Sequence, residues 1–383
     1  MRIEVHASLD DIPAPDWNRL AGESNPFLRH EFLSALERHG CVGAHYGWVP
    51  RHLAAYGDQG TLLAAVPLYL KNNSYGEFVF DGSWADAYQR AGLSYYPKRV
   101  VSIPYTPATG PRLLLAGGLE ADAAADALIE TAIEQTRKQG LSSLHWLFTT
   151  EADTRRLEDH GLLRRTGCQF HWENKGYRDF DDFLEQFTAA KRKKIKRERR
   201  YVHEAGIVIE RLHGHALSDA QWKTVHEFYR STFLKHGGIP TLNLDFFREI
   251  GRTMGDRVII VLARHQDRYV AGAINLRGTD ALYGRHWGCV EEFNGLHFEA
   301  CYYQGIEYCL QHGLRRFEPG AQGEHKISRG FLPTPTWSAH WIAHAGMRRA
   351  VADFLARERE GMGYYMRELS AHSPYKDGAC SEE

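Results

Sequence analysis

The two halves of the chain carry the same order of patterns, which constrains the fold more than any single motif. Residues 52–70 and residues 261–276 each read as a strand, a tight polar turn and a second strand. Residues 138–145 and residues 311–318 each read as the end of a helix, a glycine stop and a buried strand. The matches lie roughly 170–210 residues apart, a period too long for a solenoid and typical of a duplicated domain.

The length of the chain supports a duplication. A chain of 383 residues is long for a single core and suggests two domains. We place these domains at residues 1–178 and 179–383, so that the second domain opens with a long helix. Hydrophobic residues make up 43% of the chain and charged residues 25%, which is ordinary for a globular protein and excludes a disordered one.

Charge and cysteine content limit the classes of function. The net charge of −1 gives no overall attraction to nucleic acid or membranes, so any site for a polyanion must be local. The N-terminus lacks the apolar run of a signal peptide, and no run is long enough to span a bilayer. The cysteines, which show no Cys-x-x-Cys spacing, are Cys41, Cys168, Cys289, Cys301, Cys309 and Cys380. They read as thiols of a reducing compartment, so the sequence predicts a cytoplasmic protein without an integral membrane segment.

Hydrophobic periodicity predicts helices and strands along the whole chain. The predicted helices are residues 29–39, 120–139, 181–206, 219–236, 244–254, 297–312 and 347–369. The main predicted strands are residues 48–56, 61–70, 99–103, 144–148, 168–177, 207–212, 258–264, 269–276, 282–288 and 336–343. Short polar turns join several strands in pairs, which indicates an α+β fold with mixed, mostly antiparallel sheets and flanking helices.

A glycine-rich loop follows the short predicted strand at residues 314–317. Glycines at positions 320, 323 and 330 allow the backbone to take a positive φ or to approach a ligand closely. The loop holds two carboxylates, an imidazole and two cations, namely Glu318, Glu324, His325, Lys326 and Arg329. Such groups at the end of a strand suit anion binding or proton transfer, and the alternative is a solvated polar loop.

The predicted helix at residues 181–206 contains the only dense basic run of the chain, at residues 191–200. Leu184, Ile195 and Val202 keep one face apolar, so the basic residues cover the remaining surface. This face is either a solvated surface or a grip on the phosphates of tRNA, of a nucleotide-linked precursor or of coenzyme A. In the second case the contacts come from Lys191, Lys194, Arg197 and Arg200.

These segments resemble a known family. The duplicated plan is similar to two GCN5-related N-acetyltransferase (GNAT) domains in tandem, and more closely to the Fem-type transferases. Residues 191–209 resemble the Fem basic helix that leads into a Gly-Val strand, and residues 269–276 resemble the Fem "vaGal" strand. Residues 306–308, 313–320 and 326–331 resemble the closing Fem segment. The segments at 104–112 and 324–331 resemble a bacterial branch labelled peptidoglycan biosynthesis or recognition protein.

The resemblance implies an N-acyltransferase, since Fem-type enzymes use two GNAT-like domains to attach amino acids to peptidoglycan precursors. The implied donor is an aminoacyl-tRNA or an acyl-CoA, with no tightly bound cofactor, and the implied acceptor is a small-molecule or peptide amine. A GNAT-type CoA site has an Arg/Gln-x-x-Gly-x-Gly/Ala loop before a helix, which residues 291–296 lack. This difference favours aminoacyl-tRNA, although the long coiled-coil insertion that some Fem enzymes use for tRNA is absent too.

Acyl transfer to an amine needs a held donor, removal of an amine proton and stabilisation of an oxyanion. By the resemblance, Lys326 takes the place of the Fem loop lysine and contacts an anion, with Arg329 in support. The candidates for the base are Glu318, Glu324 and His325, the last because its ordinary pKa is near neutral.

Two further regions are candidates for substrate binding. His286 lies beside Trp287 on a central predicted strand, with core packing as the alternative. The proline- and glycine-rich residues 104–112 predict an ordered loop. The side chains of this loop that we expect to line an acceptor site are Tyr105, Thr109 and Arg112.

Other chemistries find little support in the sequence. His340 and His344 are four residues apart but do not form a helical His-Glu-x-x-His motif, and no metal site is predicted. No motif indicates DNA binding. Two hypotheses remain: an N-acyltransferase acting on an amine, or a non-catalytic recognition module of degenerate transferase fold that binds a cell-wall precursor or peptide.

Overall fold

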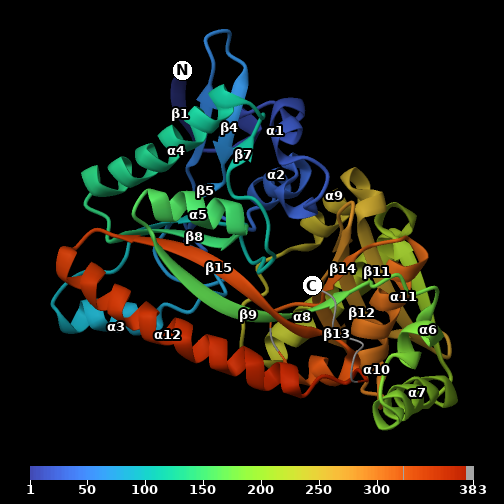
Figure 1. The fold of residues 1–383 in the computed structure, drawn as a ribbon. Coiled ribbons are helices and arrows are strands. Elements are labelled where there is room, and N and C mark those ends of the chain that lie inside the picture. The colour runs from blue at the N-terminus through green and yellow to red at the C-terminus, as the bar shows by residue number, and fades with distance from the viewer. Residues whose placement is uncertain (322, 377–383) are drawn as a thin grey trace. The chain divides into compact units, whose positions relative to one another are not determined.

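The computed structural model describes residues 1–321 and 323–376. The chain divides into two compact units, and neither is continuous in sequence (Figure 1). Unit 1 comprises Met1–Cys168 and Pro335–Tyr364, and unit 2 comprises Gln169–Thr334 and Tyr365–Glu383. These units differ from the predicted division after residue 178, which stays a prediction, because the end of the second half belongs largely to unit 1.

Unit 1 contains two runs of paired strands. Its strands are β1 (Arg2–His6), β2 (Trp48–Pro50), β3 (His52–Tyr56), β4 (Leu62–Val66), β5 (Leu68–Lys71), β6 (Lys98–Val101), β7 (Leu114–Leu115), β8 (Ser143–Thr149) and most of β15 (Leu332–Ile342). One run has the order β1-β3-β4-β7, and the other has the order β15-β8-β6-β5-β2. Pro67 separates β4 from β5, because proline has no N–H to donate to a strand ladder.

The helices of unit 1 cover these strands. They are α1 (Ala14–Ala21), α2 (His30–Arg38), α3 (Gly82–Arg90), α4 (Leu119–Lys138), α5 (Glu151–Asp159) and the greater part of α12 (Ala345–Ala371), with short 3-10 turns at Leu9–Asp11 and Pro26–Leu28. α4 lies along β3 and β4 in Figure 1. Its buried face consists of small and aliphatic residues, among them Ala124, Ala125, Leu128, Ile129 and Ala132.

Unit 2 is built on one run of strands. They are β10 (Ile207–His213), β11 (Val258–His265), β12 (Arg268–Arg277), β13 (Ala281–Cys289), β14 (Arg316–Glu318) and the end of β9 (Leu163–Glu173). Their order is β10-β11-β12-β13-β14-β9. The three successive strands predicted between residues 258 and 288 are confirmed, and they pair as antiparallel neighbours.

The helices of unit 2 are α6 (Phe180–Glu185), α7 (Ala189–Glu204), α8 (Asp219–Lys235), α9 (Leu244–Thr253), α10 (Leu296–Phe298) and α11 (Gln304–Gln311), with a π-helical stretch η5 (Glu299–Tyr303) and 3-10 turns at Gly214–Ala216, Gly255–Arg257 and Glu324–Arg329. The predicted single helix at residues 181–206 is wrong, since α6 and α7 are separate. Backbone pairing explains the break: Phe187 forms a bridge with Tyr375, and the N–H of Thr188 donates to Pro374 O at 3.0 Å.

Two strands account for the discontinuous units. β9 is the last strand in the first half of the sequence, but its Trp172 pairs with Phe317 of β14 in unit 2. β15 closes the second half, yet in unit 1 its Trp341 pairs with Leu144 of β8. Backbone pairing over long sequence separations, rather than chain order, therefore sets the composition of each unit.

The internal repeat predicted from the sequence is confirmed. In unit 1, β6 and β8 pair in parallel and α4 lies between them in the chain. In unit 2, β13 and β14 pair in parallel and α11 lies between them in the chain. The other strand pairs described within each unit are antiparallel. Each unit is thus an α+β layer structure in which one parallel pair interrupts an antiparallel sheet.

Helix α8 packs very closely against one face of the unit 2 sheet. Gly272 of β12 and Gly288 of β13 face each other across the strands. A Cβ on Gly288 would lie 1.8 Å from the carbonyl oxygen of Phe228 in α8, which no side chain tolerates. The glycine pair therefore lets α8 rest directly on the sheet, next to the end of β13.

Candidate active site

The candidate site lies in unit 2, where two parallel strands separate. β13 and β14 run side by side as far as the pair Tyr283–Glu318. A cavity of about 80 Å³ follows, bounded by the next residues of β13 and by Pro319. Its lining residues are Ala273, Ile274, Asn275, Gly284, Arg285, His286, Trp287, His297, Cys301, Tyr302 and Pro319.

A β-bulge shapes the strand side of this cavity. Ile274 faces His286 and Asn275 faces Gly284, so the register skips Arg285. Bulges of this kind re-aim side chains and are frequent beside active sites. Burial lowers the pKa of Arg285 to about 10, which leaves its guanidinium charged at neutral pH. Burial, with the Arg285 charge nearby, holds the pKa of His286 well below its ordinary value, so its imidazole is neutral.

The π-helical stretch η5 supplies Cys301 and Tyr302 to the same cavity. Such stretches are rare and occur frequently at functional sites. Glu299 at the start of η5 is buried and accepts hydrogen bonds from Arg199 at 2.9 Å and Gln304 at 2.7 Å. These bonds fix the turn, and burial raises the pKa of Tyr302, so its phenol remains protonated.

The predicted glycine loop reaches the cavity through His325. Residues 324–329 form a 3-10 turn, η6, in which His325 Nε2 lies 2.9 Å from the Tyr302 hydroxyl oxygen. Burial and the neighbouring charges of Arg329, Lys326 and Lys194 lower the pKa of His325. The imidazole is therefore neutral at pH 7, the form that accepts a proton.

Lys326 is one of two buried cations of the loop, the other being Arg329. The Lys326 side chain is 2% exposed, and its Nζ donates to the carbonyl of Gly320 at 2.7 Å. Burial lowers the pKa of Lys326 to about 8. Its charge acts on the pKa values of His297 and Cys301, which both line the cavity. An ammonium in this place supports the predicted anion contact.

Arg329 has structural partners. Its guanidinium donates to both carboxylate oxygens of Glu198 in α7, at 2.8 and 3.2 Å, and to the His325 carbonyl at 2.8 Å. It also lies over the ring of Phe298, 3.3 Å from its centre. Because these contacts hold η6 against α7, we assign Arg329 to positioning the loop instead of to substrate binding.

None of the three predicted bases, Glu318, Glu324 and His325, belongs to the lining of the cavity. Glu318 is buried, with Oε1 3.0 Å from Arg316 Nε and Oε2 3.8 Å from His171 Nε2. Glu324 is exposed and accepts a hydrogen bond from the Tyr365 hydroxyl at 2.6 Å. Glu318 is connected to the cavity through its chain neighbour Pro319, and His325 through its contact with the Tyr302 hydroxyl. We prefer His325 as the base, because its imidazole contacts a polar group of the lining.

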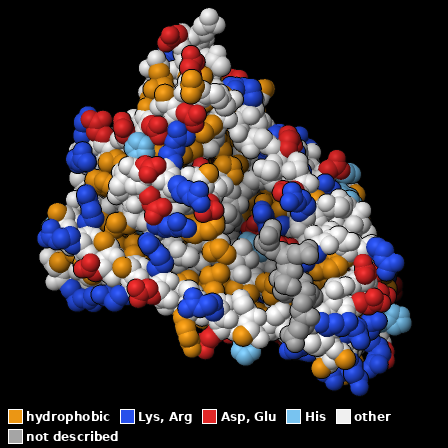
Figure 2. Space-filling view, in the orientation of Figure 1, with side chains coloured by type: hydrophobic (Ala, Val, Ile, Leu, Met, Phe, Trp, Pro, Cys, Tyr) orange, Lys and Arg blue, Asp and Glu red, His pale blue; other side chains and the backbone are white. Residues whose placement is uncertain are grey.

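α7 presents the predicted cationic face. Lys191 and Lys194 are half-buried, whereas Arg197 and Arg200 are exposed. Glu204 lies 3.5 Å from Arg200, and within the described part of the chain no ion pair involves the other three. Figure 2 shows Lys and Arg side chains gathered over α7. Since Lys194 acts on His325, this face extends to the loop beside the cavity.

The predicted acceptor loop at residues 104–112 belongs to unit 1, where its side chains serve the fold. Arg112 is fully buried and donates to the carbonyl oxygens of Leu147, Gly110 and Ala108 at 2.9, 3.1 and 2.8 Å. Tyr105 is buried and donates to Cys41 O at 2.8 Å, and Thr109 is half-buried. We therefore leave these three residues out of the site in unit 2.

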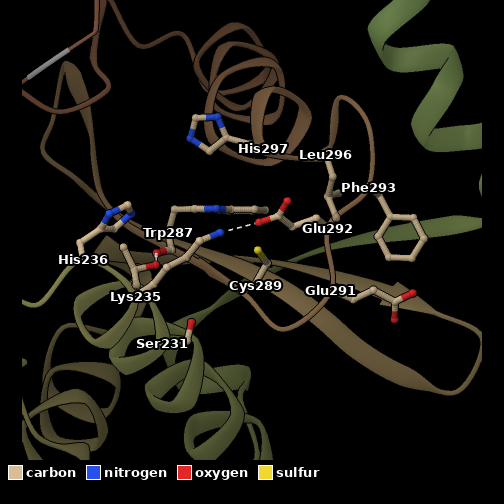
Figure 3. A pocket seen from close by; sticks show the side chains of 11 residues that line it. Ser231, Lys235, His236, Trp287, Cys289, Glu291, Glu292, Phe293, Leu296 and His297 are labelled. Atoms are coloured by element: carbon tan, nitrogen blue, oxygen red, sulfur yellow. Dashed lines mark hydrogen bonds and ion pairs between the residues drawn. The ribbon is translucent and has the colours of Figure 1, made fainter.

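A second cavity, of about 240 Å³, adjoins the first, since Trp287 and His297 line both (Figure 3). The sequence interpretation missed both of these residues, as well as Arg285, Cys301 and Tyr302. Aromatic and cysteine side chains on a predicted strand or helix read as core, and the bulge and the π turn have no clear signal in a single sequence. The one available signal was the run Arg285-His286-Trp287, polar and bulky in the middle of a strand.

The described residues contain neither a metal-binding cluster nor a membrane-spanning helix. No group of three or more His, Cys, Asp or Glu side chains in residues 1–321 and 323–376 is arranged to hold a metal ion. No helix in that part of the chain combines the length and the apolar character needed to cross a membrane. The described cysteines are free thiols, and Cys380 lies outside the described residues.

Comparison with known proteins places this geometry in a family. The model of the FemAB-like family, described as peptidoglycan biosynthesis/recognition, matches residues 8–377. The chain belongs to the FemAB-like family. The crystal structure of FemX superposes with a TM-score of 0.55 at 12% identity, covering 92% of this chain and 100% of FemX. L-PGS from Bacillus licheniformis superposes with a TM-score of 0.50 at 9% identity, covering 88% of this chain and 98% of its own.

These relatives establish the fold of the FemAB-like chain as a tandem GNAT-like α+β architecture, as predicted. No curated protein matches the sequence significantly. The parallel pair β13 and β14 of unit 2 corresponds to the parallel pair β6 and β8 of unit 1.

Proposed function

We propose that unit 2 transfers an acyl or aminoacyl group from an activated donor to an amine. One observation carries this proposal: the loop that holds a buried ammonium, Lys326, and a neutral imidazole, His325, contacts the cavity that opens where β13 and β14 separate, because His325 Nε2 lies 2.9 Å from the hydroxyl of the lining residue Tyr302. The donor carbonyl would enter that cavity, within the field of Lys326. Enclosure strengthens the interaction of an ammonium with developing negative charge, because water is excluded there.

The proposed chemistry uses the chain's own groups. The amine nitrogen attacks the ester carbon of the donor, and negative charge develops on the carbonyl oxygen, which the Lys326 ammonium stabilises. The neutral imidazole of His325 accepts a proton from the attacking nitrogen, while Tyr302 holds the ring in place. The carbon–oxygen ester bond then breaks, the leaving oxygen takes up a proton, and an amide is formed.

An aminoacyl-tRNA is the donor that the charges favour. Four cations of α7 extend from the cavity side of the loop over an exposed surface, which suits a long phosphate backbone. The turn before α10 carries Glu291 and Glu292, whose carboxylates would repel the pyrophosphate of a coenzyme A at that helix start. A donor of this class is made in the cytoplasm, so the proposal places the reaction there.

The family description supports a peptidoglycan precursor as the acceptor. The test is to incubate the full-length protein with precursor peptides and either labelled aminoacyl-tRNAs or acetyl-CoA, and to read the mass of the acceptor. We expect an added aminoacyl group in amide linkage from the tRNA donor. Acetyl transfer alone would contradict the donor assignment, and precursor binding without transfer from either donor would make this chain a recognition module.

A further inference from the structure

One buried carboxylate of α7 links the two elements that meet beside the smaller cavity. Glu198 lies between Ile195 and Val202 on the buried face of α7, where helical periodicity predicts an apolar side chain. Its exposed fraction is 8%. The Tyr303 hydroxyl of η5 donates a hydrogen bond to Oε2, and the Arg329 guanidinium of η6 donates to both oxygens, at 2.8 and 3.2 Å. Glu198 therefore joins η5 to η6.

The two joined elements carry the hydrogen-bonded pair of the site. Tyr302 of η5 directly precedes Tyr303, and His325 of η6 stands four residues before Arg329. Arg329 also donates to the His325 carbonyl at 2.8 Å, so it holds the backbone of the residue whose imidazole contacts Tyr302. The 2.9 Å contact between His325 Nε2 and the Tyr302 hydroxyl thus depends on where Glu198 holds the two elements.

A second set of bonds keeps α7 in place independently of Glu198. The next residue, Arg199, donates to Glu299 at the start of η5 at 2.9 and 3.0 Å, and to Glu307 of α11 at 2.7 Å. Loss of the Glu198 carboxylate would therefore release η6 from a helix that stays on η5. The cations of α7 that are proposed to bind the donor phosphates would also keep their places.

Stability alone does not explain a buried ion pair of this kind. The cost of taking two charges out of water can exceed their attraction, and apolar side chains of similar volume often give equal or greater stability. An ion pair with two parallel bonds adds a fixed geometry. Since a misplacement of about 1 Å can lower the rate of a reaction about 10²-fold, such geometry has a large effect on catalysis.

We propose that Glu198 is a positioning residue of the transfer reaction. Acting through Arg329 and Tyr303, it holds η6 on η5 so that the His325 imidazole keeps its observed place. The role in transfer rests on the proposed function, whereas the placement of the imidazole does not. One experiment with substrates and one on the free protein therefore test the two parts separately.

The decisive variant replaces the whole polar group by apolar side chains. E198L/Y303F/R329M removes both charges and the phenol that would lose its partner, so we expect a folded protein with a melting temperature near that of the wild type. Its kcat should fall about 10- to 10²-fold, because the imidazole is no longer held in place. Its KM for aminoacyl-tRNA should stay within about 2-fold of the wild type, because the cations of α7 remain.

Two further variants complete the series. E198D keeps the charges and shortens the side chain by one methylene, so its kcat should lie between those of the wild type and the triple variant. E204Q removes a carboxylate of the same helix that lies 3.5 Å from Arg200 on the exposed side, and it is the control, with kcat expected to stay unchanged. A folded triple variant with wild-type kcat would overturn the proposal. An unfolded triple variant would overturn it too, because Glu198 would then serve stability.

The free protein gives a readout that needs no donor. NMR spectra of isotope-labelled histidine side chains report the hydrogen bonding of each imidazole, and H325Q identifies the signals of His325. We expect these signals in the triple variant to shift toward those of Y302F, which lacks the hydroxyl. Unchanged His325 signals, with normal transfer by the wild type, would contradict the inference alone. The expected shift, with no transfer by the wild type from any donor, would contradict the proposed function alone.

Discussion

Replacing Lys326 with methionine is expected to reduce transfer about 10²–10³-fold while the protein stays folded. The loss follows because the ammonium is proposed to stabilise the oxyanion, and removal of one such donor typically costs that factor. The fold is expected to gain stability, since a buried ammonium is costly to desolvate and methionine is apolar and similar in length. The difference between the ordinary pKa of 10.5 and about 8 corresponds to roughly 3 kcal/mol, offset in part by the lost bond to Gly320.

The pH dependence has a defined sign. Below pH 8 the lysine is protonated in both the folded and the unfolded state, and the folded state carries the full desolvation cost. Between pH 8 and 10.5 the unfolded state binds more protons, so this group makes the free energy of unfolding rise with pH. Wild-type transfer should fall as pH rises through about 8, because the ammonium is lost. In K326M the stability rise attributed to this lysine should disappear.

The measurements are kcat/KM for transfer and thermal unfolding at several pH values. K223M, at an exposed lysine of α8, is the matched control and should change neither. A K326M protein with wild-type turnover would remove Lys326 from the chemistry. A K326M protein that is less stable and inactive together would make the lysine a structural residue.

Removing the cationic face of α7 is the second large change. Substitution of Lys191, Lys194, Arg197 and Arg200 by alanine is expected to weaken aminoacyl-tRNA binding roughly 10²-fold at low salt. Each phosphate contact contributes about 0.7–0.9 to the slope of log affinity against log salt, so the slope should fall by up to about 3. Binding of a short 3′-aminoacyl adenosine should change little, because it lacks the tRNA body.

The control for this experiment carries the same loss of charge elsewhere. Lys138, Arg155, Lys223 and Arg252 are exposed cations on α4, α5, α8 and α9, and their replacement by alanine should leave tRNA affinity within about 3-fold of wild type. Equal loss in both quadruple variants would show that only total charge matters. An unchanged salt slope in the α7 variant would make that face a solvated surface.

Much of the fold was predictable, because local patterns decide it. The repeat was visible in the hairpin at residues 52–70 and in the helix-glycine-strand segment ending at His145, and both occur again in unit 2. The pairing partners of β9 and β15, and hence the unit that each strand joins, were not predictable. Alternating hydrophobicity says that a strand is half-buried, but it does not say which distant strand will supply its hydrogen bonds.

The site was predictable only in part. Lys326 and His325 became candidates because glycines and mixed charges gather in one loop, and their roles stay a prediction. The contacts of Arg112 and Arg329 could not be predicted, since a sequence does not reveal that a guanidinium is buried among carbonyl or carboxylate oxygens. Tyr302 and His297 were missed because their roles depend on a π turn and on cavities formed by distant segments.

The most direct test of the central claim is where the reacting end of the donor binds. Hydrogen exchange, read by mass spectrometry on the full-length protein, would compare the free state with a complex of non-hydrolysable 3′-aminoacylamino adenosine. We expect slower exchange in peptides covering residues 281–303, 318–321 and 323–330, which provide walls of the cavity and the loop beside it. Protection confined to residues 98–116 of unit 1, with unit 2 unchanged, would contradict it.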